Sequence, residues 1–308
     1  MLTTISGKPV SRFSFGTMQF GGKADEAASA ALYAASREAG INFFDTAYVY
    51  HDGLSEKITG RLIAEERDDI YLATKAGGSR VATPEQIRME FDESRVRLGI
   101  ETVDLLYLHQ IDPNTPLEET LGAFRELVAS GAVRHVGLSN HAAWQVMKGR
   151  AIARDMGFDI TVLQPMYNLV KRQAEVEILP MAEAEGFVVC PYSPLGGGLL
   201  TGKYASEGAG RLVDDAMYKA RYRLDWMHSA AQSLKDLADE LGTHPATLAV
   251  AWTARHPGVW GPILSARSVS QLEPSLAGMT FEMSDELYAR ISGLSPTPAP
   301  ANDRLEEA

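Results

Sequence analysis

The chain has 308 residues, 45% hydrophobic and 22% charged, and its formal net charge of −11 disfavours nucleic acid and anionic membranes as general partners. Its single cysteine, Cys190, excludes an intrachain disulfide and suits a reducing compartment. Because Met1–Val10 lack the apolar core of a signal peptide and no apolar run is long enough to span a bilayer, we expect a cytoplasmic globular protein without a membrane partner.

Short runs typical of strands alternate along the chain with longer amphipathic stretches typical of helices. The expected strands are Arg12–Phe15, Ile41–Phe44, Ile70–Thr74, Val103–Leu108, Val133–Leu138, Ile160–Gln164, Phe187–Pro191 and Val259–Leu264. The expected helices are Glu26–Ala39, Ser55–Glu65, Pro84–Leu98, Leu117–Ser130, Ala143–Asp155, Glu175–Glu185, Ser229–Leu241, Pro245–Arg255 and Asp285–Ser292. Eight strands with helices between them predict a parallel sheet closed into a (β/α)8 TIM barrel, and an open doubly wound sheet is the alternative.

No internal repeat or linker divides the chain, so we expect a single domain. The barrel is expected to occupy residues 1–294. The remaining segment, 295–308, is rich in Pro and Ala and is expected to be an irregular or disordered tail.

In a TIM barrel the reacting groups gather at the C-terminal ends of the strands. The polar residues at or just after the expected strands are Asp45, Lys75, His109, Ser139, Asn140, Gln164, Tyr192 and Ser193, and Tyr50 lies in the loop after the second strand. Singly, each has an ordinary structural explanation, such as a helix cap for Asp45 or a core position for His109. An acid, a phenol, an amine and an imidazole at one predicted mouth favour a shared catalytic site.

This set of side chains suits the reduction of a carbonyl group. When a hydride adds to the carbonyl carbon, the oxygen must be protonated, and the Tyr50 hydroxyl can supply that proton. Its ordinary pKa of about 10 is high for this task, so we expect the Lys75 ammonium to lower it. Asp45 would hold Lys75 charged, and His109 would donate a hydrogen bond to the carbonyl oxygen. Since no side chain carries a hydride, a nicotinamide or flavin is required.

The glycines and basic residues indicate where such a cofactor could bind. No G-x-G-x-x-G motif is present, so a Rossmann-type site has no support. Gly197–Lys203 matches most of a P-loop, but Tyr204 stands where Ser or Thr would bind magnesium, which gives a triphosphatase little support. The same loop suits a pyrophosphate. Arg267, just before a short helical stretch at Val269–Ala277, suits a 2′-phosphate and favours NADPH over NADH.

A series of motifs runs in order from Gly16-Thr17-Met18 to about Ser275. They are FDTAYVYHDGLSE (Phe44–Glu56), LATK (Leu72–Lys75), DLLYLHQIDPNTPLEET (Asp104–Thr120), VGLSN (Val136–Asn140), LQPMYN (Leu163–Asn168), YSPLGGGLLTGKY (Tyr192–Tyr204) and the SARSVSQLE stretch. Each motif is modest alone, but the ordered set closely resembles the aldo-keto reductase family. The resemblance implies a TIM barrel, a small carbonyl compound as substrate, and NADPH as the usual cofactor, extended across the barrel mouth.

The resemblance also implies roles for individual residues. A catalytic tetrad corresponds to Asp45, Tyr50, Lys75 and His109, with Tyr50 as the general acid, and no metal is expected. The positions that correspond to cofactor contacts are Gly16, Thr17, Met18, Asp45, Ser139, Asn140, Gln164, Tyr192, Ser193, Pro194, Leu195, Gly197, Leu199, Lys203, Arg267 and Gln271.

The sequence departs from the family pattern near the predicted phosphate site. Pro274-Ser275 stand where many members have Glu-Asn, so the amide that contacts adenine is missing, and the proline is a reason to expect a shorter helix. Ser265 replaces a glycine often found two residues before the arginine.

Two other functions remain open from the sequence. A lyase or isomerase would use Lys75 as a Schiff base, which requires a neutral amine. A sensor or regulatory module would bind nicotinamide and turn over slowly, as do the potassium-channel β-subunits that the chain also resembles. Sugars, sugar phosphates, reactive dicarbonyls and pyridoxal are all candidate substrates, and no oligomeric state is specified. The residues expected near the substrate are Met18, Gln19, Phe20, Tyr48, Tyr218 and Trp226.

Overall fold

The computed structural model of the chain describes residues 2–205, 211–302 and 304. Eight parallel strands form one sheet in the order β7-β6-β5-β4-β3-β2-β1-β8. The strands are β1 (Ser14–Gly16), β2 (Phe43–Asp45), β3 (Tyr71–Ala76), β4 (Val103–Leu108), β5 (Val133–Ser139), β6 (Ile160–Gln164), β7 (Val188–Val189) and β8 (Ile263–Leu264). The backbone N–H groups of Trp260 and Ile263 each donate at 2.9 Å to the carbonyls of Val189 and Pro191, which joins the two ends of this order. The predicted TIM barrel is therefore confirmed, and the alternative of an open doubly wound sheet is excluded.

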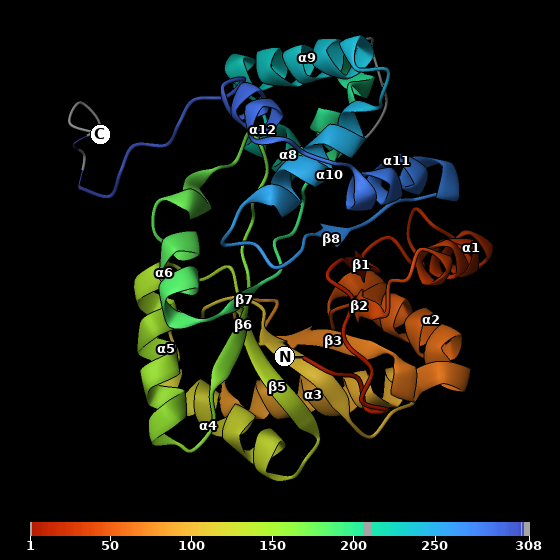
Figure 1. Ribbon diagram of the computed structural model, residues 1–308. Coiled ribbons are helices and arrows are strands. Elements are labelled where there is room, and N and C mark those ends of the chain that lie inside the picture. Colours follow the sequence, from red (N-terminus) through yellow and green to blue (C-terminus); the bar gives the residue numbers. More distant parts are fainter. Residues whose placement is uncertain (1, 206–210, 303, 305–308) are drawn as a thin grey trace.

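The helices surround the ring of strands (Figure 1). They are α1 (Glu26–Glu38), α2 (Leu54–Ile63), α3 (Pro84–Leu98), α4 (Leu117–Ala129), α5 (Ala143–Asp155), α6 (Ile178–Glu185), α7 (Arg211–Asp214), α8 (Ala216–Arg221), α9 (Asp225–Glu240), α10 (Pro245–Arg255), α11 (Val269–Thr280) and α12 (Asp285–Ser292). Several begin at capping side chains: Asp25, Thr83 and Ser284 each accept a hydrogen bond from the backbone N–H three residues later. No helix of the described residues is long and apolar enough to cross a membrane.

The last two strands are shorter than the sequence predicts. β7 and β8 have two residues each, whereas the apolar runs extend over Phe187–Pro191 and Val259–Leu264. Proline explains much of this difference, because neither Pro191 nor Pro262 has an N–H group for the ladder.

Helix α11 is longer than the predicted Val269–Ala277 and continues to Thr280 with Pro274 inside it. The expectation that the proline shortens this helix is wrong. Pro274 is the sixth residue of the helix, so only the carbonyl of Ser270, in the first turn, loses its helical partner. The Thr247 hydroxyl donates a 2.8 Å hydrogen bond to the Pro274 carbonyl and ties the helix to α10.

Alternation along the strands decides which residues reach the site. Phe43, Tyr71 and Leu105 pack together in the barrel interior, while their neighbours Phe44, Leu72 and Leu106 pack in separate clusters beneath the helices. The inward positions recur every second residue. Continuing each series to the strand end gives Asp45 in β2, Lys75 in β3 and His109 after β4.

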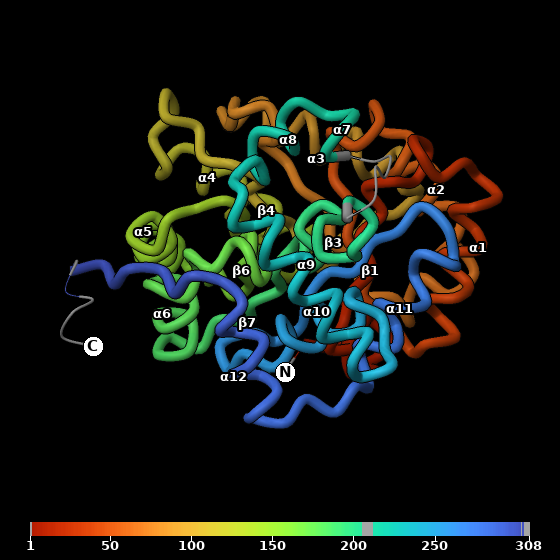
Figure 2. The backbone as a smooth tube through the Cα atoms, turned by 90° about the horizontal axis from the view of Figure 1, so that it is seen from above, coloured from red at the N-terminus to blue at the C-terminus, as the bar shows by residue number. Residues whose placement is uncertain are grey.

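The segment between β7 and β8 contains elements that sequence reasoning did not separate. A 3-10 turn at Gly196–Thr201 precedes the short helices α7 and α8. Residues 206–210 of the loop before Trp226, and residues 303 and 305–308 of the predicted tail, lie outside the described residues. After α12, the described part of the chain has no helix or strand and runs away from the barrel in both views (Figure 1, Figure 2).

Candidate active site

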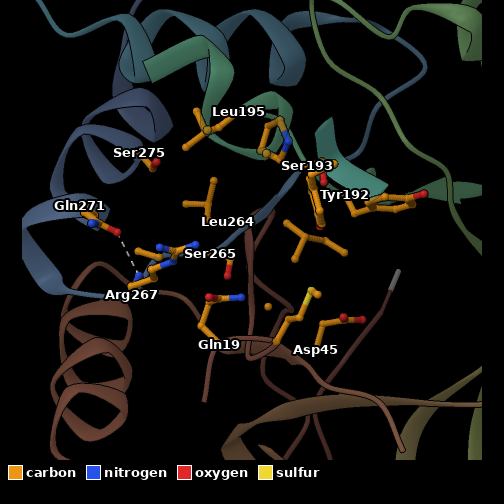
Figure 3. Close-up of a pocket in the computed structure, with 18 of the residues that line it drawn as sticks. Gln19, Asp45, Tyr192, Ser193, Leu195, Leu264, Ser265, Arg267, Gln271 and Ser275 are labelled. Atoms are coloured by element: carbon orange, nitrogen blue, oxygen red, sulfur yellow. Dashed lines mark hydrogen bonds between the residues drawn. The ribbon is translucent and has the colours of Figure 1, made fainter. Parts of the chain in front are cut away.

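A cavity of about 580 Å³ opens where the strands end. Figure 3 shows Asp45 and Tyr192 toward one end of it and Arg267, Gln271 and Ser275 toward the other. The sequence-predicted site residues that line it are Gly16, Met18, Asp45, Tyr50, His109, Ser139, Asn140, Gln164, Tyr192, Ser193, Pro194, Leu195, Gly197, Lys203, Arg267 and Gln271. One continuous cavity thus brings most of the predicted catalytic and cofactor positions together.

Asp45 and Lys75 form a buried ion pair at the floor of the cavity. The Lys75 ammonium donates to Oδ1 of Asp45 and, at 2.6 Å, to the Thr46 carbonyl. Nε2 of Gln164 donates to the other oxygen of Asp45 at 2.8 Å. Burial raises the pKa of Asp45, and Lys75 opposes this. Burial alone would lower the pKa of Lys75, but Asp45 and then Tyr50 reverse that effect, so the pKa lies above its ordinary value and Lys75 is charged at neutral pH.

Tyr50 places a phenol beside this ion pair. Its hydroxyl lies 3.5 Å from Lys75 Nζ, which sits 5.1 Å from the Tyr50 ring centroid. Burial raises the pKa of Tyr50 and Lys75 lowers it, and the net pKa is above the ordinary value. The expected lowering by Lys75 is therefore present as one contribution, but burial outweighs it.

The turn after Tyr50 fixes its position. His51 and Asp52 adopt φ values of 49° and 52°, a left-handed conformation in which Asp and His are enriched among residues with a side chain. A ring nitrogen of His51 lies 2.9 Å from the Met18 carbonyl. A Cβ on Gly22 would meet the His51 ring at 2.1 Å, so a larger residue there would displace this ring.

His109 faces Tyr50 across the cavity floor. The two ring centroids are 6.2 Å apart and the rings are nearly perpendicular, at 85°. Burial, followed by the charge of Lys75, lowers the pKa of His109 to about 3, so the imidazole is neutral at physiological pH. Its Nδ1 is buried and has no hydrogen-bond partner among the described residues. The backbone around His109 is held by the Ala76 carbonyl at 2.8 Å and the Asn140 amide at 3.0 Å.

A network of side chains covers the ends of β5 to β7. The Ser139 hydroxyl donates to the Gln164 carbonyl at 3.0 Å, and Nδ2 of Asn140 donates to the Ser139 hydroxyl at 3.1 Å. The Tyr192 hydroxyl donates to Oδ1 of Asn140 at 2.7 Å. Asn140 has a φ of 60°, as asparagine tolerates. The network presents amide and hydroxyl groups and one aromatic ring to the cavity.

The glycine-rich loop forms the next part of the wall. Gly197 and Gly198 have φ values of 66° and 98° and lie in the 3-10 turn. A Cβ on Gly197 would meet the Tyr218 ring at 2.7 Å, and one on Gly198 would meet Nζ of Lys203 at 3.0 Å. This turn is not the helix N-terminus that a P-loop requires, which removes the structural context for a triphosphatase.

The far end of the cavity combines a cation with buried hydroxyls. The backbone N–H of Arg267 donates to Oε1 of Gln271 at 3.3 Å, which Figure 3 marks with a dashed line. Ser265 and Ser275 both line the cavity, and Oγ of each is buried without a partner among the described residues. Buried hydroxyls are normally hydrogen-bonded, so both serines have hydrogen-bonding capacity that no described residue uses.

Some predicted residues lie outside the cavity lining. Lys75 is covered by Asp45 and Tyr50, Thr17 binds the Asp45 carbonyl through its backbone N–H at 2.8 Å, and the Leu199 side chain is buried in the core. Of the residues expected near the substrate, Met18, Gln19 and Tyr218 line the cavity. The others do not: Phe20 is in the core, Tyr48 binds Glu93, and Trp226 lies on α9.

Further lining residues were not predicted as site residues. They are Gln110, Met217, Arg221, His244, Ala246, Ile263, Leu264, Ala266 and Ser270, while Gly198 and Thr201 belong to the loop that was predicted to suit a pyrophosphate. The position of His244 at a helix start could be read from the sequence, because it stands just before Pro245, a residue typical of the first helical position. In the structure, Nδ1 of His244 caps α10 by accepting a hydrogen bond from the backbone N–H of Ala246. Met217 and Arg221 are spaced i, i+4 on α8, but nothing local in the sequence places α8 over the cavity.

Comparison with known proteins decides the family. The family model described as "Aldo/keto reductase family" matches residues 12–296. The chain belongs to this family. Aldo/keto reductases are oxidoreductases that generally use a nicotinamide cofactor and act on small carbonyl compounds, and this general activity is what the family supports here.

Several relatives of this aldo/keto reductase match along most of their length. The uncharacterized oxidoreductase YrpG of Bacillus subtilis is 33% identical over 95% of this chain and 94% of its own. Aflatoxin B1 aldehyde reductase member 2 of Rattus norvegicus is 36% identical over 89% of this chain and 81% of its own. A probable voltage-gated potassium channel subunit beta of Arabidopsis thaliana is 35% identical over 88% of both chains.

Proposed function

We propose that this aldo/keto reductase uses NADPH to reduce an aldehyde or ketone to an alcohol, with Tyr50 as the general acid. The observation that carries the proposal is one cavity with two chemically different ends. At one end Tyr50 lies 3.5 Å from the buried ammonium of Lys75. At the other, Arg267 stands near two buried hydroxyls without partners among the described residues.

The residues along the cavity fit an extended dinucleotide. Asn140, Ser139 and Gln164 offer amide and hydroxyl groups for a carboxamide, and the Tyr192 ring offers a face for stacking. Gly197 and Lys203 suit a pyrophosphate. Arg267 suits a 2′-phosphate, and Ser265 and Ser275 have free hydrogen-bonding capacity beside it. When bound, the dinucleotide would supply the hydride.

The protein's own groups would orient the carbonyl and deliver a proton. The Tyr50 hydroxyl, whose pKa is raised, stays protonated at neutral pH and can donate to the carbonyl oxygen. Lys75 would stabilise the phenolate that remains, and Asp45 holds Lys75 in place. Neutral His109 would donate a second hydrogen bond to the same oxygen.

The alternative of a Schiff-base lyase fits this geometry poorly. An amine nucleophile must be neutral and accessible, whereas Lys75 is charged, paired with Asp45 and covered from the cavity. A sensor with slow turnover would have the same cavity residues, so only the rate of NADPH oxidation distinguishes it from a reductase.

The test is an intrinsic-fluorescence titration with NADPH and with NADH, continued with a panel of aldehydes while NADPH absorbance is followed. We expect tight NADPH binding and oxidation by at least one aldehyde. Binding without oxidation by any aldehyde would favour the sensor. Absence of binding by both cofactors would overturn the proposal.

A further inference from the structure

The Lys75 ammonium is fully buried and directs its N–H groups at three oxygens. It donates to Oδ1 of Asp45, to the Thr46 carbonyl at 2.6 Å and toward the Tyr50 hydroxyl at 3.5 Å. The last distance is longer than that of an ordinary hydrogen bond. Since a carboxylate attracts an ammonium more strongly than a phenol does, these three contacts alone do not hold the ammonium close to Tyr50.

Two aromatic rings also lie against this ammonium. Nζ of Lys75 is over the Tyr50 ring, 5.1 Å from its centroid, and over the Tyr107 ring, 5.8 Å from its centroid. Tyr50 belongs to the loop after β2, whereas Tyr107 belongs to β4 and is part of the core inside the barrel. A ring face attracts a cation within about 6 Å of its centroid, and most strongly where water is excluded. Tyr107 therefore contributes to holding the ammonium from the interior of the barrel.

The register of the sheet places Tyr107 beside Lys75. Lys75 in β3 pairs with Tyr107 in β4, and Tyr107 pairs with Gly137 in β5, so the side chains of Lys75 and Tyr107 share the inward face. A Cβ on Gly137 would meet the Tyr107 ring at 2.5 Å. The ring thus occupies the space that a side chain from β5 would fill, and the glycine makes room for it at the level of Lys75.

The hydroxyl of Tyr107 does not account for a tyrosine at this position. The residue is fully buried, and its hydroxyl has no hydrogen-bond partner among the described residues. Burial, followed by Cys190 and Asp45, raises the pKa of Tyr107 well above its ordinary value, so the phenol stays neutral. Because a buried hydroxyl without a partner costs free energy, the contribution of Tyr107 to the site lies in its ring.

We propose that Tyr107 is a positioning residue for the reduction, whose ring holds the Lys75 ammonium close to the Tyr50 hydroxyl. This inference rests on the proposed function and adds a residue to the same site. Tyr107 does not line the cavity and acts through Lys75. With an aliphatic side chain in its place, the ammonium would settle toward Asp45, and the phenolate left after proton transfer would be stabilised less.

The test compares Tyr107→Leu, which removes the ring, with Tyr107→Phe, which keeps it. Tyr107→Met removes the ring but fills more of its volume, so it separates loss of the ring from loss of packing. Tyr71→Leu is the matched control, because Tyr71 lies four residues before Lys75 on the same strand, is fully buried and also has a hydroxyl without a partner among the described residues. The ring of Tyr71 packs against Phe43, at 5.0 Å between centroids.

The measured quantities are the single-turnover rate of NADPH oxidation by 4-nitrobenzaldehyde, the KM for this aldehyde and the NADPH dissociation constant. We expect Tyr107→Leu and Tyr107→Met to lower the rate about 3- to 30-fold with the other two quantities unchanged, because a cation–π contact to a desolvated ammonium is lost. Tyr107→Phe and Tyr71→Leu should stay within about twofold of the wild-type rate, because both keep the ring beside Lys75.

Three results would overturn the inference. A wild-type rate in Tyr107→Leu would show that the ring is not needed. Equal losses in Tyr107→Leu and Tyr71→Leu would assign the effect to core packing. Equal losses in Tyr107→Leu and Tyr107→Phe would assign it to the hydroxyl.

A stability measurement without turnover separates this inference from the proposed function. Urea denaturation compares the effect of Tyr107→Leu in the wild type and in a Lys75→Met/Asp45→Asn background, which removes the ammonium without leaving an unpaired buried charge. We expect Tyr107→Leu to raise the unfolding equilibrium constant about 3- to 30-fold more in the wild type than in that background. Such coupling without reduction of any aldehyde would contradict the proposed function alone. Equal effects in both backgrounds would contradict the inference, whether or not an aldehyde is reduced.

Discussion

The side-chain amide of Gln164, at the end of β6, donates a 2.8 Å hydrogen bond to Oδ2 of Asp45, at the end of β2. These strands are not neighbours in the sheet, so the bond crosses the barrel mouth. It leaves Oδ1 of Asp45 to Lys75. The carboxylate is thereby satisfied on both oxygens, which is the condition for keeping a charged lysine buried beside Tyr50.

Replacing Lys75 by Met should therefore affect both stability and catalysis. The variant leaves Asp45 buried without its partner, and we expect a loss of about 3–5 kcal/mol in the free energy of unfolding. Reduction should fall about 100-fold or more, because the phenolate is no longer stabilised. Urea denaturation of Lys75→Met and of the double variant with Asp45→Asn checks the first point. The double variant should recover part of the stability, and an equal loss in both would contradict the ion-pair explanation.

Arg267→Ala should distinguish the two nicotinamide cofactors. Loss of one charge-assisted contact to a 2′-phosphate is expected to weaken NADPH binding about 10- to 100-fold and to change NADH binding little. Fluorescence titration gives both dissociation constants. Arg290→Ala, in which the lost arginine pairs with Glu240 away from the cavity, serves as the control. Equal losses for both cofactors would show that Arg267 does not bind the 2′-phosphate.

The neutral His109 should make the protein less stable at mildly acidic pH. Its folded-state pKa is about 3, whereas an unfolded histidine titrates near 6.5, so the unfolded chain binds a proton first as the pH falls below 6.5. Neutral His109 therefore imposes no stability cost above pH 6.5, and the cost grows as the pH falls below that value. Between pH 7 and pH 5 we expect His109 to account for a loss of about 1–2 kcal/mol.

Urea denaturation of the wild type and His109→Gln at both pH values measures this contribution. The wild type should lose more stability than the variant on acidification, because other histidines contribute equally to both. A parallel loss in the two proteins would mean that His109 titrates normally in the folded state.

A glycine inside β5 should be intolerant of even a methyl group. A Cβ on Gly137 would meet the Tyr107 ring at 2.5 Å and the Val162 carbonyl at 2.9 Å inside the barrel. Gly137→Ala is expected to destabilise the protein by about 1–3 kcal/mol through overpacking. Gly122→Ala, on α4 with open space around it, should instead stabilise it by about 0.5–1 kcal/mol. Thermal denaturation of both variants provides the comparison, and similar shifts would contradict the packing argument.

Much of this site follows from short-range rules that the sequence displays. Side chains alternate along a strand, so Asp45 points inward like Phe43, and Lys75 points inward like Tyr71. The residues at the strand ends therefore predict which side chains meet at the barrel mouth. The ordered motifs predicted the family and, through the resemblance, the positions expected to contact the cofactor.

Other features depend on tertiary structure that the sequence does not display locally. The net pKa of Tyr50 depends on how deeply the barrel buries it, and burial outweighs the neighbouring Lys75. Pro274 stays inside α11 because the chain of α10 supplies Thr247 as a partner. Arg221 reaches the cavity only because α8 folds over its mouth, a placement set by distant packing.

The most direct test of the account is a single-turnover measurement of NADPH oxidation by an aldehyde substrate in wild type and Tyr50→Phe, with the NADPH dissociation constant measured in parallel. Tyr50 is assigned as the proton donor because its hydroxyl is protonated and lies 3.5 Å from Lys75 Nζ. The variant should bind NADPH nearly as well as the wild type and react about 100-fold more slowly or worse. Retention of most of the wild-type rate in Tyr50→Phe would contradict the assignment.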